Sequence, residues 1–139
     1  MSQLDAQDKR ISAIFGGAIP DVTEASLETY RAYLRENLEL PCQLTGIEDF
    51  SWEEYYVFGP GSQKEYESLK KTRPSYRDKF NLISFEDLID EGAGILIEVR
   101  RVSDRRKFTI PLADLEATDK RSKNHQLLDD YSVWFVNNR

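Results

Sequence analysis

Residues 95–100 (ILIEVR) and residues 108–112 (FTIPL) decide the fold class of this chain. In both stretches apolar side chains recur at every second position, which is the spacing of a β-strand with one buried face. The intervening residues are Leu96, Glu98 and Arg100 in the first stretch and Thr109 and Pro111 in the second, and a turn near Ser103 and Asp104 would bring the two strands together as a hairpin. The sequence therefore predicts an antiparallel hairpin over these two stretches.

Further short strands are predicted on either side of this hairpin. Residues 40–44 alternate, residues 55–58 (YYVF) and 80–85 are rich in aromatic and branched side chains, and residues 131–136 (YSVWFV) close the chain with the same composition. The connections are too short for parallel crossovers. We therefore expect a small, strongly bent antiparallel sheet or a partly open barrel of about five to six strands.

The N-terminal part of the chain has a helical period instead. Residues 1–20 predict a short helix followed by a Gly/Pro break, and Leu27, Tyr30, Leu34 and Leu38 predict an amphipathic helix over 22–39. The chain has the length of one domain, so we expect a single α+β domain over 1–139, helical over 1–40 and β-rich over 41–139. A short helix is also expected over 62–71, after a Ser62 cap.

Composition excludes several functional classes. The 19 basic and 25 acidic residues give a net charge of −6, which disfavours a nucleic-acid partner. The basic residues of the hairpin, from Arg100 to Lys107, are interpreted as a solvated edge. No apolar run is long enough for a bilayer, and the single cysteine suits a reducing compartment. A cytoplasmic protein without a membrane partner is expected.

No catalytic constellation is visible. The only histidine, His125, lies in a stretch predicted as a polar loop, and Cys42 lies on the apolar phase of a strand, so neither suggests a nucleophile or a zinc site. A hydrolase built on two carboxylates remains a weaker alternative because it needs a sizeable cleft. We therefore expect a binding or regulatory protein and not an enzyme.

Acidic residues form the most suggestive pattern. They cluster at 48–54, at 86–91 and at 114–130, in regions predicted as loops. Calcium prefers six to eight oxygen ligands, and loop carboxylates and carbonyls supply them. A second hypothesis is a protein-interaction adaptor, which would use an exposed aromatic surface around Trp52, Tyr55 and Trp134.

Four segments also resemble a known family. They are residues 44–47 (LTGI), 55–58 (YYVF), 110–116 (IPLADLE) and 127–135 (LLDDYSVWF), and they resemble the CcbP-like family of small bacterial calcium-binding proteins. The resemblance covers about residues 40–135. It implies an SH3-like bent sheet and intracellular calcium binding through acidic loops. By position, it implies a set of candidate Ca²⁺ ligands: Glu48, Asp49, Glu53, Asp114, Glu116, Asp129 and Asp130.

Overall fold

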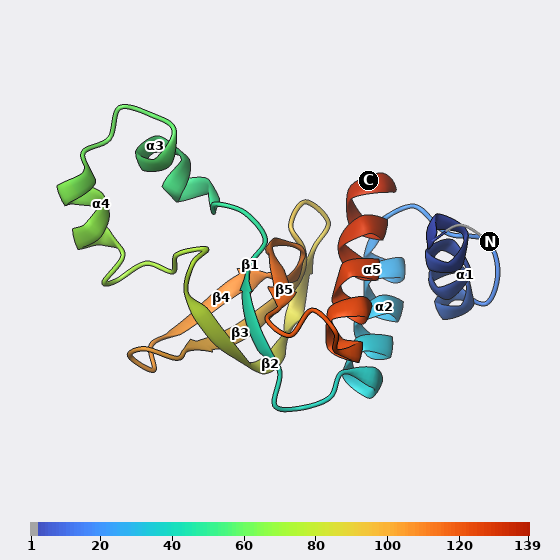
Figure 1. The fold of residues 1–139 in the computed structure, drawn as a ribbon. Coiled ribbons are helices and arrows are strands. Elements are labelled where there is room, and N and C mark those ends of the chain that lie inside the picture. Colours follow the sequence, from blue (N-terminus) through green and yellow to red (C-terminus); the bar gives the residue numbers. More distant parts are fainter. Residues whose placement is uncertain (1–2) are drawn as a thin grey trace.

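The computed structural model describes residues 3–139 of the chain (Figure 1). The helices are α1 (Gln3–Phe15), α2 (Glu24–Asn37), α3 (Glu54–Val57), α4 (Gln63–Leu69) and α5 (Lys123–Asn137). The strands are β1 (Gln43–Gly46), β2 (Lys79–Asp90), β3 (Gly94–Arg101), β4 (Lys107–Pro111) and β5 (Leu115–Ala117). Two short 3₁₀ turns, η1 (Ser51–Glu53) and η2 (Leu112–Asp114), complete the described elements. The predicted α+β class is confirmed.

The strands form one open antiparallel sheet in the order β4-β3-β2-β1-β5. The predicted hairpin forms one end of the sheet, with β4 as an edge strand; β3 pairs with β4, and Ile97 lies opposite Ile110. The long strand β2 has two irregularities in its register with β3, between Leu82 and Ser84 and between Phe85 and Ile89. Such irregularities increase local bending, as expected for a small bent sheet.

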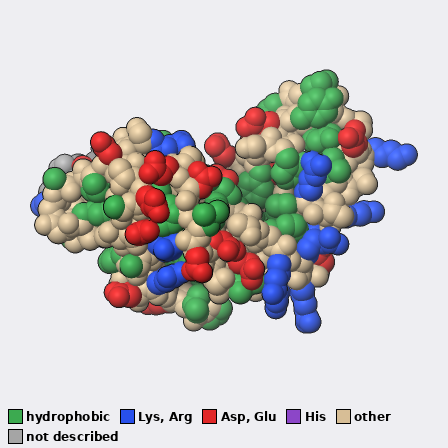
Figure 2. Space-filling model, turned by 180° about the vertical axis from the view of Figure 1, so that it is seen from behind, with side chains coloured by type: hydrophobic (Ala, Val, Ile, Leu, Met, Phe, Trp, Pro, Cys, Tyr) green, Lys and Arg blue, Asp and Glu red, His purple; other side chains and the backbone are tan. Residues whose placement is uncertain are grey.

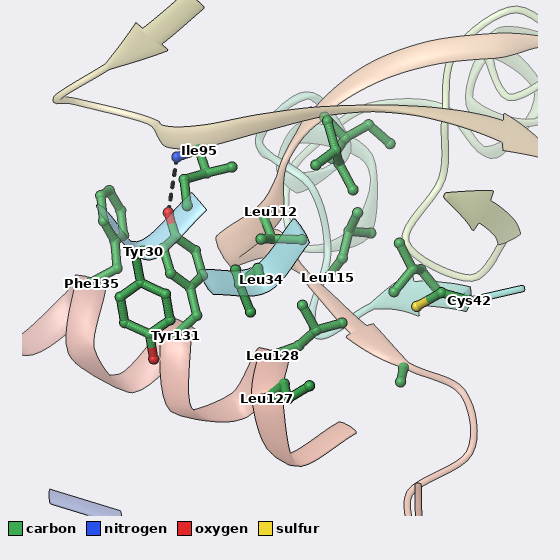
Figure 3. Packing of buried hydrophobic residues seen from close by; sticks show 14 of the residues in the cluster. Tyr30, Leu34, Cys42, Ile95, Leu112, Leu115, Leu127, Leu128, Tyr131 and Phe135 are labelled. Atoms are coloured by element: carbon green, nitrogen blue, oxygen red, sulfur yellow. Dashed lines mark hydrogen bonds between the residues drawn. The ribbon is translucent and has the colours of Figure 1, made fainter. Parts of the chain in front are cut away.

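The three longer helices lie together on one side of the sheet (Figure 1). The core lies between them, with residues from α2 and α5 packed on the inner side chains of β3 and β5 (Figure 3). Tyr131 of α5 is fully buried, and its hydroxyl accepts a hydrogen bond from the backbone N–H of Ile95 at 2.9 Å. This bond fixes α5 against the start of β3.

Gly94 makes the close approach of α5 and β3 possible. Its φ is +80°, a conformation that glycine adopts without steric cost. A Cβ atom at this position would lie 2.5 Å from the Tyr131 hydroxyl oxygen and 2.7 Å from the ring of Phe135. No larger residue fits here unless the helix moves away from the sheet.

Two predicted strands are wrong. Residues 131–136 belong to helix α5, which begins after the Ser122 cap. The apolar residues of α5 have helical spacing, and that spacing takes precedence over the β-propensity of the aromatic side chains. Residues 55–58 are also not a strand, because α3 occupies Glu54–Val57 and none of the strand pairings described involves it.

Other boundaries shifted. The strand β5 lies in a segment predicted as a polar loop, and β2 continues through residues 86–90, which were predicted as an acidic loop. Helix α2 is confirmed, and its cap is Thr23, whose side chain accepts a hydrogen bond from the Ser26 N–H. Residues 3–15 form the expected first helix.

Residues 51–78 form an arm, containing α3 and α4, that projects away from the helical layer (Figure 1). Arg101 joins this arm to the sheet. The residue is 3% exposed, and its guanidinium donates to the carbonyl oxygens of Lys70, Lys71 and Arg73 at 2.8–2.9 Å. The same group pairs with Asp78 and Asp104. Within residues 3–139, no helix is long and apolar enough to cross a membrane.

Candidate functional site

The loop after β1 lies directly beside the η2 turn. The Ile47 N–H donates to the carbonyl oxygen of Asp114 at 3.0 Å, and the Gly46 N–H donates to that of Tyr76 at 3.0 Å. Gly46 is required here, because a Cβ atom would lie 2.6 Å from the Tyr76 Cβ. These backbone contacts bring the acidic residues 48 and 49 next to Asp114, which is 65 residues further along the sequence.

A pocket of about 280 Å³ opens between these segments. Its polar lining comes from three parts of the chain: the loop after β1, the start of α3, and the η2–α5 region. The acidic and hydroxyl residues among those that line it are Glu48, Asp49, Ser51, Glu54, Asp114 and Ser132. Four of these six residues are carboxylates, so the pocket is strongly negative.

The charge of the pocket affects Asp114 directly. The surrounding protein atoms remove part of the hydration of this carboxylate, which raises its pKa, and the nearby negative charge of Glu48 raises that pKa further. Both effects penalise the ionised form of Asp114. A bound cation would reverse them, because it stabilises the charged carboxylates that face it.

Glu53 lies beside this pocket but turns into the protein. It is fully buried, and its Oε2 accepts hydrogen bonds from the backbone N–H groups of Phe50 and Tyr76, both at 3.0 Å. Its Oε1 accepts from the Tyr66 hydroxyl at 2.9 Å. Burial and this hydrogen bond raise the pKa of Tyr66 to about 12. Glu53 thus connects the loop, the arm and α4.

The remaining predicted ligands lie elsewhere. Glu116 of β5 approaches the His125 Nε2 at 3.7 Å. Asp130 is buried and accepts two hydrogen bonds from Arg10 at 2.8 and 2.9 Å, while Gln7 donates to both Asp129 and Asp130. The structure therefore brings together Glu48, Asp49 and Asp114 but not the other four predicted residues as one set. Calcium ligation by any of the seven stays a prediction.

Among the residues that the structure describes, no group of three or more His, Cys, Asp or Glu side chains has the arrangement that would already hold a metal ion. The acidic residues 86–91 are engaged locally: Asp90 accepts from the Gly92 N–H at 2.7 Å, and Glu91 from the Glu24 N–H at 3.1 Å. The first of these bonds closes the turn between β2 and β3, and the second joins that turn to the start of α2.

The aromatic surface expected around Trp52, Tyr55 and Trp134 does not exist as one patch. Trp134 is fully buried in α5, and its indole N–H donates to the Pro20 carbonyl oxygen at 3.1 Å. Tyr55 is 55% exposed and Phe58 is 80% exposed, both on the arm. Trp134 was assigned to a surface because residues 131–136 were read as an alternating strand.

Cys42 is a core residue, as predicted. It is buried, and the resulting loss of hydration raises the pKa of its thiol to about 11. Such a thiol is mostly protonated at neutral pH and is a poor nucleophile. His125 lies in the first turn of α5, not in a loop.

Sequence reasoning noted Glu54 in an acidic cluster but did not select it as a ligand. Ser51 and Ser132 gave no signal, because a hydroxyl near a pocket is visible only once the η1 turn and α5 are packed together.

The fold and the pocket define the class of protein: a small α+β domain with an acidic pocket. A family model described as calcium binding, Calci_bind_CcbP, matches residues 62–135. The chain belongs to this calcium-binding family. Known members are described by their calcium binding, and the family description names no enzymatic activity. The resemblance inferred from the sequence is thereby confirmed.

Solved structures agree on the fold. The crystal structure of Anabaena CcbP aligns with a TM-score of 0.57 at 14% identity, over 99% of this chain and 94% of that chain. A structure described as a calcium binding protein in the calcium-binding form aligns with a TM-score of 0.58 at 16% identity, over 98% and 96%. No curated protein sequence matches the chain.

Proposed function

We propose that this protein is a cytoplasmic, non-catalytic calcium buffer or calcium-responsive regulator, and that the pocket beside η2 is its calcium site. The observation that carries the assignment of the site is the convergence of four carboxylates from three separate segments: Glu48 and Asp49, Glu54, and Asp114. Membership of a calcium-binding family and similarity to a structure in a calcium-binding form support the choice of ion.

The donor set suits a hard divalent cation. Calcium takes six to eight oxygen ligands at 2.3–2.6 Å in flexible geometry, and carboxylates, hydroxyls and loop carbonyls are its usual partners. The pocket offers carboxylates together with the hydroxyls of Ser51 and Ser132, although the Ser132 hydroxyl already donates to the Ala113 carbonyl oxygen at 3.0 Å. We expect the exposed acids of the loop after β1 to move toward Asp114 when the ion binds.

The remaining predicted acids have structural partners that explain them. Glu53 satisfies three buried donors, and Asp130 neutralises Arg10. If either carboxylate turned away from its donors to bind a metal ion, those buried donors would lose their hydrogen-bond partners, which costs free energy. We therefore place Glu53 and Asp130 in the framework of the protein and Glu48, Asp49, Glu54 and Asp114 at the ion.

The test is a titration of the chelator-treated, full-length protein with CaCl₂ by calorimetry and by thermal unfolding. A ligand that binds only the native state stabilises it by about 2.7 kcal/mol at a hundredfold excess over Kd. For a domain of this size, that corresponds to a rise in Tm of roughly 10 °C. The variant Glu48→Gln/Asp114→Asn should lose most of both signals. The matched control, Asp8→Asn/Glu36→Gln, removes two exposed acids outside the pocket and should retain them.

A further readout concerns the calcium-free protein. Because the pKa of Asp114 is raised in the folded state, its ionised form opposes folding above that pKa, and stability is lost as the pH rises through it. Asp114→Asn removes this charge, so it should raise the calcium-free Tm at neutral pH while reducing the calcium response. If the double variant binds calcium like the wild type, the ion binds elsewhere and the assignment of the pocket fails.

A further inference from the structure

The arm and the tip of the β3–β4 hairpin together form a positively charged end of this acidic protein. In Figure 2, Lys and Arg side chains gather on this side of the molecule, whereas Asp and Glu predominate over the middle of the same view. We call the following residues the basic pole: Lys71, Lys79, Arg100, Arg105, Arg106 and Lys107, all of them exposed. The net charge of the whole chain is −6, so this charge is strongly segregated.

The acids of this region leave most of the basic pole unneutralised. Asp78 and Asp104 both pair with the buried guanidinium of Arg101, at 3.0 and 2.7 Å. Arg106 and Lys107 have only loose contacts with acids: Arg106 lies 3.6 Å from Asp104. Within the described part of the chain, the side chains of Lys71, Lys79, Arg100 and Arg105 form no ion pair.

The centre of the basic pole is a row of exposed polar residues across four strands. Arg100 lies opposite both Asn81 and Lys107, and Asn81 lies opposite Gln43. Residues directly opposite each other in a sheet present their side chains on the same face. Glu98 approaches this row, with its Oε1 3.9 Å from the Lys107 Nζ. Next to the row, Asn81, Arg100 and Arg105 line an open hollow of about 340 Å³.

Arg105 occupies a position that normally favours glycine. Its φ is +63°, and it is the one residue other than glycine with positive φ in residues 3–139. This conformation costs free energy in a residue with a Cβ atom. The backbone N–H of Arg105 donates to the Arg101 carbonyl oxygen at 2.8 Å and closes the hairpin turn, while the side chain is exposed and bonds to no other described side chain. The Arg105 side chain is therefore free to contact another molecule.

The basic pole is also rigid. The Arg101 guanidinium holds the carbonyl oxygens at the end of α4 and the turn of the hairpin in one arrangement. The cations on these two segments are therefore already positioned before a partner binds. Preorganisation of this kind lowers the entropic cost of association.

We infer that the basic pole is a docking surface for an acidic segment of a partner protein. Complementary charge is the recognition chemistry, with Asn81 and Gln43 as additional hydrogen-bond groups. The acidic remainder of the chain favours a short partner segment over nucleic acid, because a long phosphate backbone would extend past the basic pole and meet the acids of residues 80–93, which contain four acidic and no basic side chains. The inference is independent of the calcium site.

The test uses a fluorescently labelled peptide of about twelve Glu and Asp residues, with the full-length protein and a chelator present so that calcium does not bridge the carboxylates. Binding is followed by fluorescence anisotropy. The charge-reversal variant Arg100→Glu/Arg105→Glu should weaken binding at least about tenfold, and a rise in salt from about 50 to 200 mM should weaken wild-type binding by a similar factor. The matched control, Lys120→Glu/Arg121→Glu, should change it less than about twofold.

Arg105→Gly separates binding from folding. It removes the cation and relieves the positive-φ conformation, so the Tm should rise while peptide binding weakens by a factor of about three. Three outcomes overturn the inference: no binding to the wild type at about millimolar peptide, an equal loss in the control variant, or tighter binding of a DNA duplex carrying the same number of charges. The last outcome would make nucleic acid the partner.

Discussion

Glu53 and Glu54 are neighbours in sequence, and we predict that they have opposite roles. Glu53 is fully buried and accepts three hydrogen bonds, whereas Glu54 is exposed and lines the candidate calcium pocket. Replacing Glu53 by Ala leaves two backbone N–H groups and the Tyr66 hydroxyl without their acceptor. Each buried donor left unpaired costs about 1–2 kcal/mol, so the three together cost about 3–6 kcal/mol.

That loss is a large part of the about 5–15 kcal/mol that stabilises a typical domain. In urea it lowers the unfolding midpoint by roughly 2 M. Glu53→Gln should be much milder. The glutamine oxygen can accept both N–H groups and its amide can donate to the Tyr66 oxygen, so only the charge assistance is lost, at about 1–2 kcal/mol.

The assay is urea unfolding of the Glu53→Ala, Glu53→Gln and Glu54→Gln variants, with and without calcium. We expect the Glu53 variants to lose stability equally in both conditions and to retain the calcium-induced increase. Glu54→Gln should leave the calcium-free midpoint nearly unchanged and reduce that increase. The reasoning is refuted if Glu53→Gln abolishes the calcium response at unchanged calcium-free stability, because Glu53 would then be a ligand.

Three further predictions follow from the packing. Gly94→Ala should cost about 2–4 kcal/mol in urea unfolding, from strain at positive φ and overlap with α5, while Gly17→Ala, with open space around it, should cost less than about 1 kcal/mol. The Tyr30 hydroxyl is buried with no hydrogen-bond partner among the described residues, so Tyr30→Phe should be neutral or stabilising by the same assay. Tyr131→Phe should cost about 1–3 kcal/mol, because the Ile95 N–H loses its acceptor. The reverse order of the two variants would contradict this assignment of hydrogen bonds. Arg101 holds the pKa of Asp104 well below its ordinary value, so this pair stabilises the protein above about pH 4, and the stabilisation disappears as the pH falls further. Asp104→Asn should therefore flatten the decline of Tm between about pH 4 and 2. An unchanged decline would argue against the pair.

Sequence periodicity was sufficient where one face of an element is buried and the other is exposed. The hairpin of residues 95–112 and the helix with Leu27, Tyr30 and Leu34 could be predicted because burial on one face leaves a regular pattern. Residues 131–136 were misassigned because the local β-propensity of the aromatic residues was weighed above the helical spacing that begins at Leu127. Residues 55–58 gave no such spacing, and only the packing of the arm makes them helical.

The candidate site was predictable only in part. Loop carboxylates and the resemblance indicated calcium and included Glu48, Asp49 and Asp114 among the acids. The sequence could not separate these from Glu53, Asp129 and Asp130. An acid at the surface and an acid that accepts hydrogen bonds from buried donors are the same residue type and have similar sequence neighbours. Which one is free to meet a cation depends on the donors that surround it after folding.

The amino-acid sequence by itself determined the α+β class, the hairpin of residues 95–112, the buried cysteine and the membership of a calcium-binding family. Only the tertiary structure decided that acids 65 positions apart share one pocket, that Trp134 is internal, and that Arg100 and Arg105 line one hollow. The physical reason is that burial of one face of a strand or helix produces a periodic pattern of apolar residues in the local sequence. Which charged residues from distant segments become neighbours depends on the register of the strands and on single buried groups such as Arg101. These features produce no pattern in the local sequence.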